Sequence, residues 1–465
     1  MRIEALICRR FFKSLLLFLL FSLIAASPGA GQVDTAMDNG IPEGGIIANP
    51  QTAYTFLGWD QLGSGLGLKD EWGVRLGGFM ILEPNWIASG GGEPNSAHAS
   101  LAMGIHTSVD LHKAIGIPGG TLGVEFLGFT GDPITNAAGC VQMFSNMDGA
   151  PPRSRIEMMQ AWWHQRIFDD KLIFHIGKMN AAGHFGTVTK PVFVTEGHLQ
   201  DSGSDISSLI WVPVGLNPTV LSIFPAYYNT AYGATVHFAP TRDFYASYGL
   251  FDGNFARGVQ TGLRWGPQFN EYKLHIGELG YSWRVGKNGK PGRLGAGVWG
   301  QTGDLYTPAL TIDHGETGYY MFANQRLWYR RPGINNSGLI GYFQYGHTGA
   351  DSVMVNEYVG AGLSGVGLVP GRPYDTISMG MAWSRLNDLP GAGAFFYPDV
   401  QSDSKDLRGN ELMLQAAYLT TFVFKTSSNF WTLTSELVYT CIPTPGQRPD
   451  LDAAHVFTAR FIVLF

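Results

Sequence analysis

The sequence predicts an all-β protein, namely a transmembrane antiparallel up-and-down β-barrel of about sixteen strands, with long extracellular loops and short periplasmic turns. Apolar residues alternate with other residues at a period of two in one segment after another, which is typical of strands with one face in an apolar medium. Short connections alternate with longer ones along the chain. Beyond the N-terminal segment, no apolar stretch is long enough to form a membrane-spanning helix.

The first 31 residues are expected to be a cleaved signal peptide. Arg9, Arg10 and Lys13 form a basic region around the start of the apolar run SLLLFLLFSLIAA, which is too short to span a membrane. Small residues in SPGAGQ follow, as a cleavage site requires. We interpret residues 32–71 as an N-terminal periplasmic segment or a partial plug, and residues 72–465 as the outer-membrane barrel.

Charge and cysteine content narrow the function. Cleavage removes four of the 31 basic residues and one of the 37 acidic residues, which leaves a net charge of −9. A chain with this charge is not expected to bind nucleic acid. Two cysteines remain, Cys140 and Cys441, and in an exported protein they can either form a disulfide or stay as two free thiols.

The alternation separates two faces on each predicted strand. In LAMGIHTSVDLH, Leu101, Met103 and Ile105 share one face, and His106 and Asp110 share the other with small and polar residues. We find about sixteen such segments, many of them close to the ~9–11 residues that a tilted strand needs to cross a bilayer. They lie near residues 73–87, 101–113, 120–130, 156–168, 171–178, 230–239, 242–252, 270–285, 293–302, 318–331, 337–347, 356–368, 374–385, 410–423, 428–440 and 455–465.

The connections favour a membrane barrel over a soluble β protein. Every second connection is a short turn such as GKNGKPG or RPGINN, and the connections between them are mostly longer. A propeller would show a repeat of ~40–50 residues, which the sequence lacks. A closed sheet pairs every backbone group inside hydrocarbon and encloses a water-filled lumen. The longest connection, about 179–229, is expected to fold into that lumen and constrict the pore.

The C-terminal stretch HVFTARFIVLF is predicted to be the strand that closes the barrel against the first strand. Phe457, Phe461 and Phe465 fall on the face predicted toward lipid, and Thr458 and Arg460 on the face predicted toward the lumen.

Several stretches from about residue 72 to 465 resemble the carbohydrate-selective porin family of Gram-negative outer membranes, of the OprB type. They are EWGVRLGG, QAWWHQRIFDDKLIFHIGKMNAAGHFG, NTAYGATVHFAPTRDFYASYGLFDGN, NQRLWYRRPG, GAGLSGVGLVPGRPYDTISMGMAWSRLN and NELMLQAAYLTTFVF. The sequence departs from the family pattern around 188–215 and at TCIPTPGQRPD. The resemblance implies a monomer, and it makes Phe465 similar to the C-terminal aromatic residue that barrel assembly machinery reads.

A sugar has an apolar C–H face and a rim of hydroxyl groups, so a channel that favours it needs an aromatic surface beside charged or amide groups. The predicted inward faces carry such a mixture. Trp162 and Trp163 must point to opposite sides of their strand, so at most one of them lines the pore. The residues that we expect to contact the sugar are Arg75, Glu83, Asp110, Glu125, Trp162 and Arg166.

The predicted function is passive diffusion of monosaccharides or related polyols through the outer membrane of a Gram-negative bacterium. The alternatives are a general or organic-acid diffusion porin and a barrel for adhesion or hydrolysis. No zinc-protease, deaminase or nucleophile-elbow motif is present, so neither catalytic residues nor a metal or other cofactor is expected. The expected partners are the sugar, the outer-membrane lipid and, through Phe465, the barrel assembly machinery.

Overall fold

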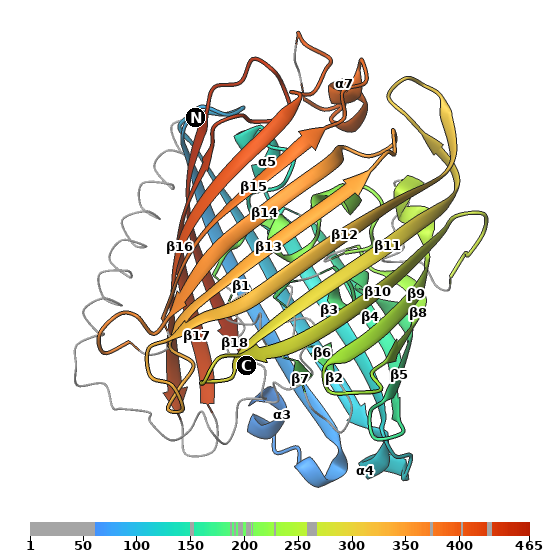
Figure 1. The fold of residues 1–465 in the computed structure, drawn as a ribbon, viewed down its shortest axis with the longest axis vertical. Helices are drawn as coiled ribbons and strands as arrows, with labels where there is room; N and C mark the ends of the chain where they lie inside the picture. The colour runs from blue at the N-terminus through green and yellow to red at the C-terminus, as the bar shows by residue number, and fades with distance from the viewer. Residues whose placement is uncertain are drawn as a thin grey trace.

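A computed structural model gives the structure of the chain. It describes residues 61–148, 153–186, 188–189, 192–193, 199–200, 206, 208–226, 229–257, 267–372, 375–400, 403–425 and 430–465. The predicted signal peptide and residues 32–60 lie outside the described residues. Within the described part, sixteen strands form one closed antiparallel barrel, which confirms the predicted fold class (Figure 1). A separate two-stranded sheet pairs β6 with β7.

The barrel follows chain order, and β1 pairs with both β2 and β18. The strands are β1 (Val74–Ser89), β2 (Ser96–Asp110), β3 (Gly120–Gly131), β4 (Arg155–Ile167), β5 (Leu172–Met179), β6 (Val192–Phe193), β7 (Leu199–Gln200), β8 (Ala231–Phe238), β9 (Phe244–Asp252), β10 (Lys273–Val285), β11 (Lys290–Tyr306), β12 (Ile312–Tyr329), β13 (Gly338–Thr348), β14 (Val355–Val366), β15 (Thr376–Leu386), β16 (Asn410–Lys425), β17 (Phe430–Ile442) and β18 (Ala454–Leu464). The sixteen barrel strands match the sixteen predicted segments, with most ends within three residues.

Helices are short and lie in the connections. They are α3 (Gln61–Gly65), α4 (Leu111–Ile115), α5 (Ile134–Ala138), α6 (Val212–Gly215) and α7 (Ala392–Phe396), with the 3-10 helices η1 (Asp70–Trp72), η2 (Ala181–Gly183), η4 (Pro218–Val220) and η5 (Gly253–Arg257). Among the described residues, none of these helices has the length and apolar character needed to cross a membrane. α4 lies at the short-turn end of the barrel, and α5 and α7 lie at the long-loop end (Figure 1).

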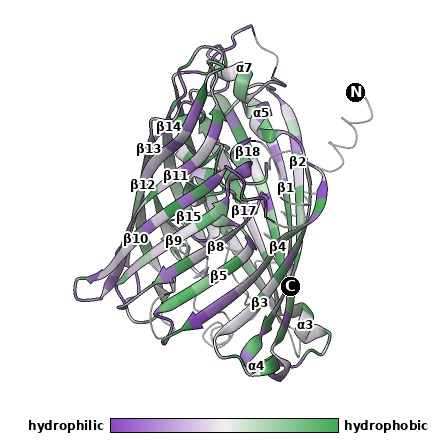
Figure 2. Cartoon of the chain, turned by 90° about the vertical axis from the view of Figure 1, so that its right-hand side faces the viewer, coloured by the Kyte–Doolittle hydropathy of each residue, from purple (hydrophilic) through white to green (hydrophobic). Residues whose placement is uncertain are grey.

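The two faces of each strand differ as the alternation predicted. On β18, Thr458 and Arg460 are buried inside the barrel, whereas Phe457 on the outer face is 47% exposed. Trp163 on β4 is likewise exposed on the outside. Hydrophobic and hydrophilic residues alternate along the strands in Figure 2. Outward apolar side chains that stay exposed are what a lipid-facing surface requires.

Glycine and inward aromatic residues complement each other across neighbouring strands. A Cβ at Gly280 on β10 would lie 2.0 Å from the ring of Tyr245 on the adjacent β9, so the ring lies flat over the glycine. The close approach needs a residue without a side chain. This pairing gives one physical reason for the high glycine and aromatic content of the chain.

Two long connections fold into the barrel and carry its main apolar core. The first, between β3 and β4, contributes α5 and the buried Phe144. The second, between β5 and β8, contributes Phe185, Leu209 and Trp211 to the same cluster. Described parts of the segment expected to constrict the pore are therefore buried inside the ring of strands; that they limit the conductance stays a prediction.

Cys140 and Cys441 are both free thiols. Cys140 is buried in the β3–β4 connection, and Cys441 lies on the outward face of β17. Burial, with the nearby Glu411 carboxylate, raises the pKa of the Cys140 thiol well above its usual range. Of the two possibilities that the sequence left open, the structure therefore has the free thiols.

Candidate functional site

A buried ion pair at the closing seam fixes the β3–β4 connection inside the lumen. Arg460 of β18 donates from Nε to Glu83 Oε2 of β1 at 2.6 Å, and both side chains are completely buried. The guanidinium Nη2 also donates to Ser145 Oγ at 3.1 Å and to Asn146 Oδ1 at 2.7 Å. Ser145 in turn donates to Glu83 Oε1 at 2.5 Å. The connection is thus hydrogen-bonded to both charges of the pair.

A second carboxylate, that of Glu411, joins the β3–β4 connection to the loop between β17 and β18. Glu411 of β16 accepts hydrogen bonds from the backbone N–H groups of Val141 and Gln142, each at 2.8 Å. It also accepts one from Gly446 N at 2.7 Å, in the loop between β17 and β18. A buried carboxylate needs such donors, because it would otherwise lose its hydration without compensation.

Side chains from two separate parts of the wall, on β16 and on β10, hold the β5–β8 connection. Gln415 Oε1 of β16 accepts from Ile210 N at 2.8 Å, and Gln415 Nε2 donates to Phe144 O at 3.1 Å. Glu278 of β10 accepts from Gly186 N at 2.7 Å. Both in-folded connections are therefore bound to inward side chains of several strands, and they cover that part of the wall.

The inner wall of β4, β5 and β8 carries a cluster of aromatic and imidazole rings. We call it the Trp–His strip, and it consists of Trp162, His164, His175, His184 and His237. All five side chains are half-buried. The Trp162 and His175 ring centroids lie 4.5 Å apart in an edge-to-face arrangement, and His175 and His184 lie 4.7 Å apart. The strip combines an apolar ring face with hydrogen-bonding groups.

The neighbouring strands position Trp162. A Cβ at Gly123, its partner on β3, would lie 2.4 Å from the indole, so the indole lies against the backbone of Gly123. Beside it, Gln160 Nε2 donates to Glu125 Oε2 at 2.7 Å between β4 and β3. An aromatic surface and a carboxylate–amide pair therefore lie next to each other on one wall.

The structure brings only Trp162 and Glu125 together among the six predicted sugar contacts. Glu83 is buried beneath the β3–β4 connection, so a solute reaches it only if that connection moves. Its sequence context could not show this, because alternation predicts the face of a residue but not what covers it. Sugar contact by any of the six stays a prediction.

The remaining three lie near the short-turn end of the barrel. Asp110 caps α4 by accepting from His112 N at 2.9 Å and from Lys113 N. Arg166 donates to Asp170 at 2.6 Å. Arg75 is exposed on the inward side of β1 close to this rim. These charges are thus at the mouth of the barrel and away from Trp162.

Four histidines and one amide near Trp162 were not among the six predicted contacts: His164, His175, His184, His237 and Gln160. His175 and His237 lie on the polar faces of their strands, so alternation alone could have identified them. Gln160 lies two residues before Trp162 in the regular part of the β3–β4 pairing, so alternation places both side chains on the inward face. His184 follows η2 in a connection, where no sequence pattern indicates its contact with His175. In the described part of the chain, no group of three potential ligands is arranged to hold a metal ion.

Comparisons with known proteins agree with this architecture. The model of the carbohydrate-selective porin, OprB family matches residues 95–463. A high-pH structure of Pseudomonas putida OprB is 19% identical, with a TM-score of 0.70, and the match covers 88% of this chain and 98% of that one. The low-pH structure of the same protein is 15% identical, with a TM-score of 0.51 and the same coverage. Among curated proteins, none matches the chain.

The family and the barrel fold are those of channel proteins, and they imply the outer membrane of a Gram-negative bacterium. The match to the family model extends over most of the chain, from the end of the first long loop to the end of β18. The chain belongs to the carbohydrate-selective porin, OprB family.

Proposed function

We propose that the barrel lets monosaccharides or related polyols diffuse passively across the outer membrane, and that the Trp–His strip is the surface along which they pass. The observation that carries this proposal is the half-buried Trp162 indole, with imidazoles on one side and the Glu125–Gln160 pair on the other. An indole face packs against the C–H face of a sugar ring, and the half-buried imidazoles exchange hydrogen bonds with its hydroxyls. Glu125 and Gln160 are only 5% and 6% exposed, so the imidazoles are the more accessible polar groups.

The charges of the lumen support a neutral substrate. Glu83, Glu436 and Arg460 form one buried group, in which the Arg460 Nε lies 3.6 Å from Glu436 Oε2. Arg166 is paired with Asp170. Such pairs leave less of a single-sign field than the rows of Lys or Arg that line anion-selective pores. A general diffusion porin, or one for organic acids such as sugar acids, is the alternative function.

Conductance in planar bilayers distinguishes the two. The purified porin is reconstituted, and the open-channel current is measured while glucose and then gluconate are added. Our proposal predicts saturable block by glucose, because a bound sugar excludes ions from the narrow pore. A current that glucose does not reduce, with block or permeation by gluconate, supports the organic-acid alternative and rejects the proposal.

Outer-membrane lipid and the barrel assembly machinery remain the proposed partners, with Phe465 as the residue that the machinery reads. The support is the position of Phe465 at the seam, where its backbone pairs with β1. A monomer is proposed from the family resemblance alone.

A further inference from the structure

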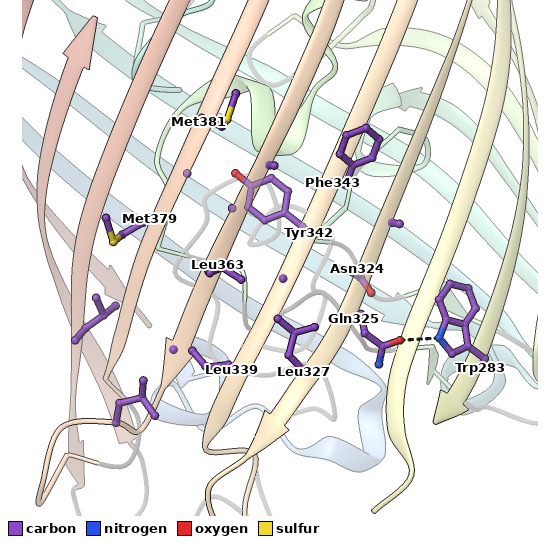
Figure 3. Close-up of a pocket in the computed structure, with 18 residues that line it drawn as sticks. Trp283, Asn324, Gln325, Leu327, Leu339, Tyr342, Phe343, Leu363, Met379 and Met381 are labelled. Carbon is purple, nitrogen blue, oxygen red and sulfur yellow. Dashed lines mark hydrogen bonds between the residues drawn. The ribbon is translucent and has the colours of Figure 1, made fainter. Parts of the chain in front are cut away.

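A groove crosses the outside of the barrel over β12, β13, β14 and β15 (Figure 3). Its volume is about 890 Å³, within the range of small-molecule sites. Small residues form its floor, among them Ala323, Gly341 and Ala361. The ridges are apolar side chains that are 38–64% exposed: Leu327, Phe343, Leu363, Ile377, Met379 and Met381.

Gly341 sets the depth of the groove. A Cβ at this position would lie 3.3 Å from Leu327 Cδ1 and 3.3 Å from Leu363 Cδ2, so the glycine lies between these two ridges. The lining residues come from the ends of β12 and β14 and the beginnings of β13 and β15, which all meet the short turns. The lining stretch of β13, Leu339 to Phe343, spans about 13 Å at ~3.3 Å per residue. This is close to the ~15 Å hydrocarbon depth of one leaflet.

Basic residues lie where the groove reaches these turns. Arg330 Nη1 donates to Gly367 O at 2.7 Å and to Leu368 O at 3.1 Å, and Leu368 lines the groove. Lys290 Nζ donates to the carbonyl of the ridge residue Leu327 at 2.9 Å. Lys287 is exposed in the turn between β10 and β11, and Arg331 is exposed in the turn between β12 and β13. Neither residues 284–293 nor 326–341 contain an acidic residue.

The short turns elsewhere on the rim differ in charge. Lys113 near the β2–β3 turn is paired with Asp70 at 2.8 Å, and Arg166 at the β4–β5 turn is paired with Asp170 at 2.6 Å. Next to the groove, Arg372 has Asp375 at 2.9 Å, but the turns after β10 and β12 have no such acid. Positive charge without acidic neighbours is thus concentrated at one end of one apolar groove.

A polar pair also marks this end. Trp283 Nε1 donates to Gln325 Oε1 at 2.7 Å, and Gln325 Nε2 donates to Pro291 O at 3.1 Å (Figure 3). Both side chains line the groove. Indole and amide groups at the boundary between apolar and basic surface are typical of the membrane interface.

We infer that the groove binds one anionic phospholipid of the periplasmic leaflet, with an acyl chain between the ridges and the phosphate group at the basic turns. An acyl chain suits an apolar groove of one-leaflet depth, and the basic cluster suits a headgroup with net negative charge. A zwitterionic phospholipid would fit the same groove but gain less from these charges, so the site selects by headgroup.

Native mass spectrometry tests this inference. The purified full-length porin is incubated with equal amounts of phosphatidylglycerol and phosphatidylethanolamine, and the lipid that it retains is identified. Wild-type protein is expected to retain phosphatidylglycerol preferentially. Arg330→Gln and Arg331→Gln should each lower that preference roughly fivefold, the effect of losing ~1 kcal/mol of attraction per charge. Arg330 also holds the β14–β15 turn through its hydrogen bonds to Gly367 O and Leu368 O, whereas Lys287 lies in another turn. Lys287→Gln should therefore lower the preference through its charge alone.

Filling the groove tests the acyl-chain part. Ala361→Leu should lower retention of both lipids, whereas Ala234→Leu, on the outer face of β8 and away from the groove, should not. Lys171→Gln is the matched charge control at the β4–β5 turn. The inference would be overturned if wild-type protein retained the two lipids equally, or if none of the three charge variants had an effect. It would also be overturned if a second copy of the protein occupied the groove, which would appear as a dimer that Ala361→Leu disrupts.

Discussion

Phe465 and Gly78 exchange two backbone hydrogen bonds, from Gly78 N to Phe465 O at 2.6 Å and from Phe465 N to Gly78 O at 3.0 Å. A Cβ at Gly78 would lie 2.7 Å from the Phe465 ring, so the ring packs directly on the glycine. The two residues extend the pairing of β18 with β1 beyond Leu464 and complete the seam of the barrel. Pairing at this seam removes the two sheet edges that hydrocarbon would leave unsatisfied.

The seam predicts an assembly defect in Phe465→Ala. The variant loses the ring that packs on Gly78, and with it the aromatic residue proposed as the assembly signal. We expect less heat-modifiable barrel in outer-membrane fractions at unchanged synthesis. Phe174→Ala, a lipid-facing change on β5, serves as the control. Wild-type amounts of folded Phe465→Ala would reject this role.

Removing Arg460 should release the β3–β4 connection. Breaking one partner of a fully buried ion pair costs about 3–5 kcal/mol, because the remaining carboxylates lose their counter-charge. Arg460→Ala is therefore expected to lower the unfolding temperature and, since Ser145 and Asn146 lose their donor, to raise single-channel conductance. Arg75→Ala, at the exposed mouth, should change neither strongly. An Arg460→Ala channel with normal stability and conductance would contradict the anchoring role of Glu83 and Arg460.

The β5–β8 connection should limit the current. Ile210 N donates to Gln415 Oε1 of β16, and Ser208 Oγ donates to Ser378 Oγ of β15 at 2.5 Å. The segment 208–216 is therefore held against β15 and β16. Replacing residues 208–216 by a Gly-Ser linker is expected to increase single-channel conductance and weaken any sugar block. If both stay unchanged, the connection does not constrict the pore.

Asp148 should make the stability of the β3–β4 connection depend on pH. Burial raises the pKa of Asp148, against the hydrogen bonds from Thr135 and the charge of Arg153. The native state then holds a proton more tightly than the unfolded state, so stability falls as pH rises from about 4 through the raised pKa. Asp148→Asn keeps an acceptor for Thr135 N but does not titrate. Wild-type unfolding temperature should drop relative to Asp148→Asn over this range, and parallel curves would contradict the prediction.

The fold could be predicted from the sequence because lipid imposes one rule on every strand. Each strand must place apolar side chains outward, and short turns must alternate with long loops, so the period of two is repeated sixteen times. The opposite orientations of Trp162 and Trp163 follow from the same rule. Two strand ends were missed: β11 continues to Tyr306, and β12 already begins at Ile312. Both ends lie in a region that reads as a loop, where the alternation is weaker.

The site could be predicted only in part, because inward orientation does not determine exposure. Glu83 faces inward as expected, and so does Glu411, yet each is buried by a connection whose path depends on long-range hydrogen bonds. His184 follows η2 and contacts His175 only because of the path of the β5–β8 connection, which the sequence pattern does not indicate. The lipid-facing groove depends on which small residues become neighbours across four strands, and this requires the exact register.

Glucose block of Trp162→Ala, with Trp163→Ala as control, tests whether sugars pass along the Trp–His strip. The two residues are adjacent on β4, but only Trp162 belongs to the Trp–His strip. In planar bilayers, we expect Trp162→Ala to raise the glucose concentration for half-block about tenfold, which corresponds to ~1.4 kcal/mol of lost ring packing. Trp163→Ala should retain wild-type block. Equal glucose block in wild type and Trp162→Ala would show that Trp162 does not bind the sugar.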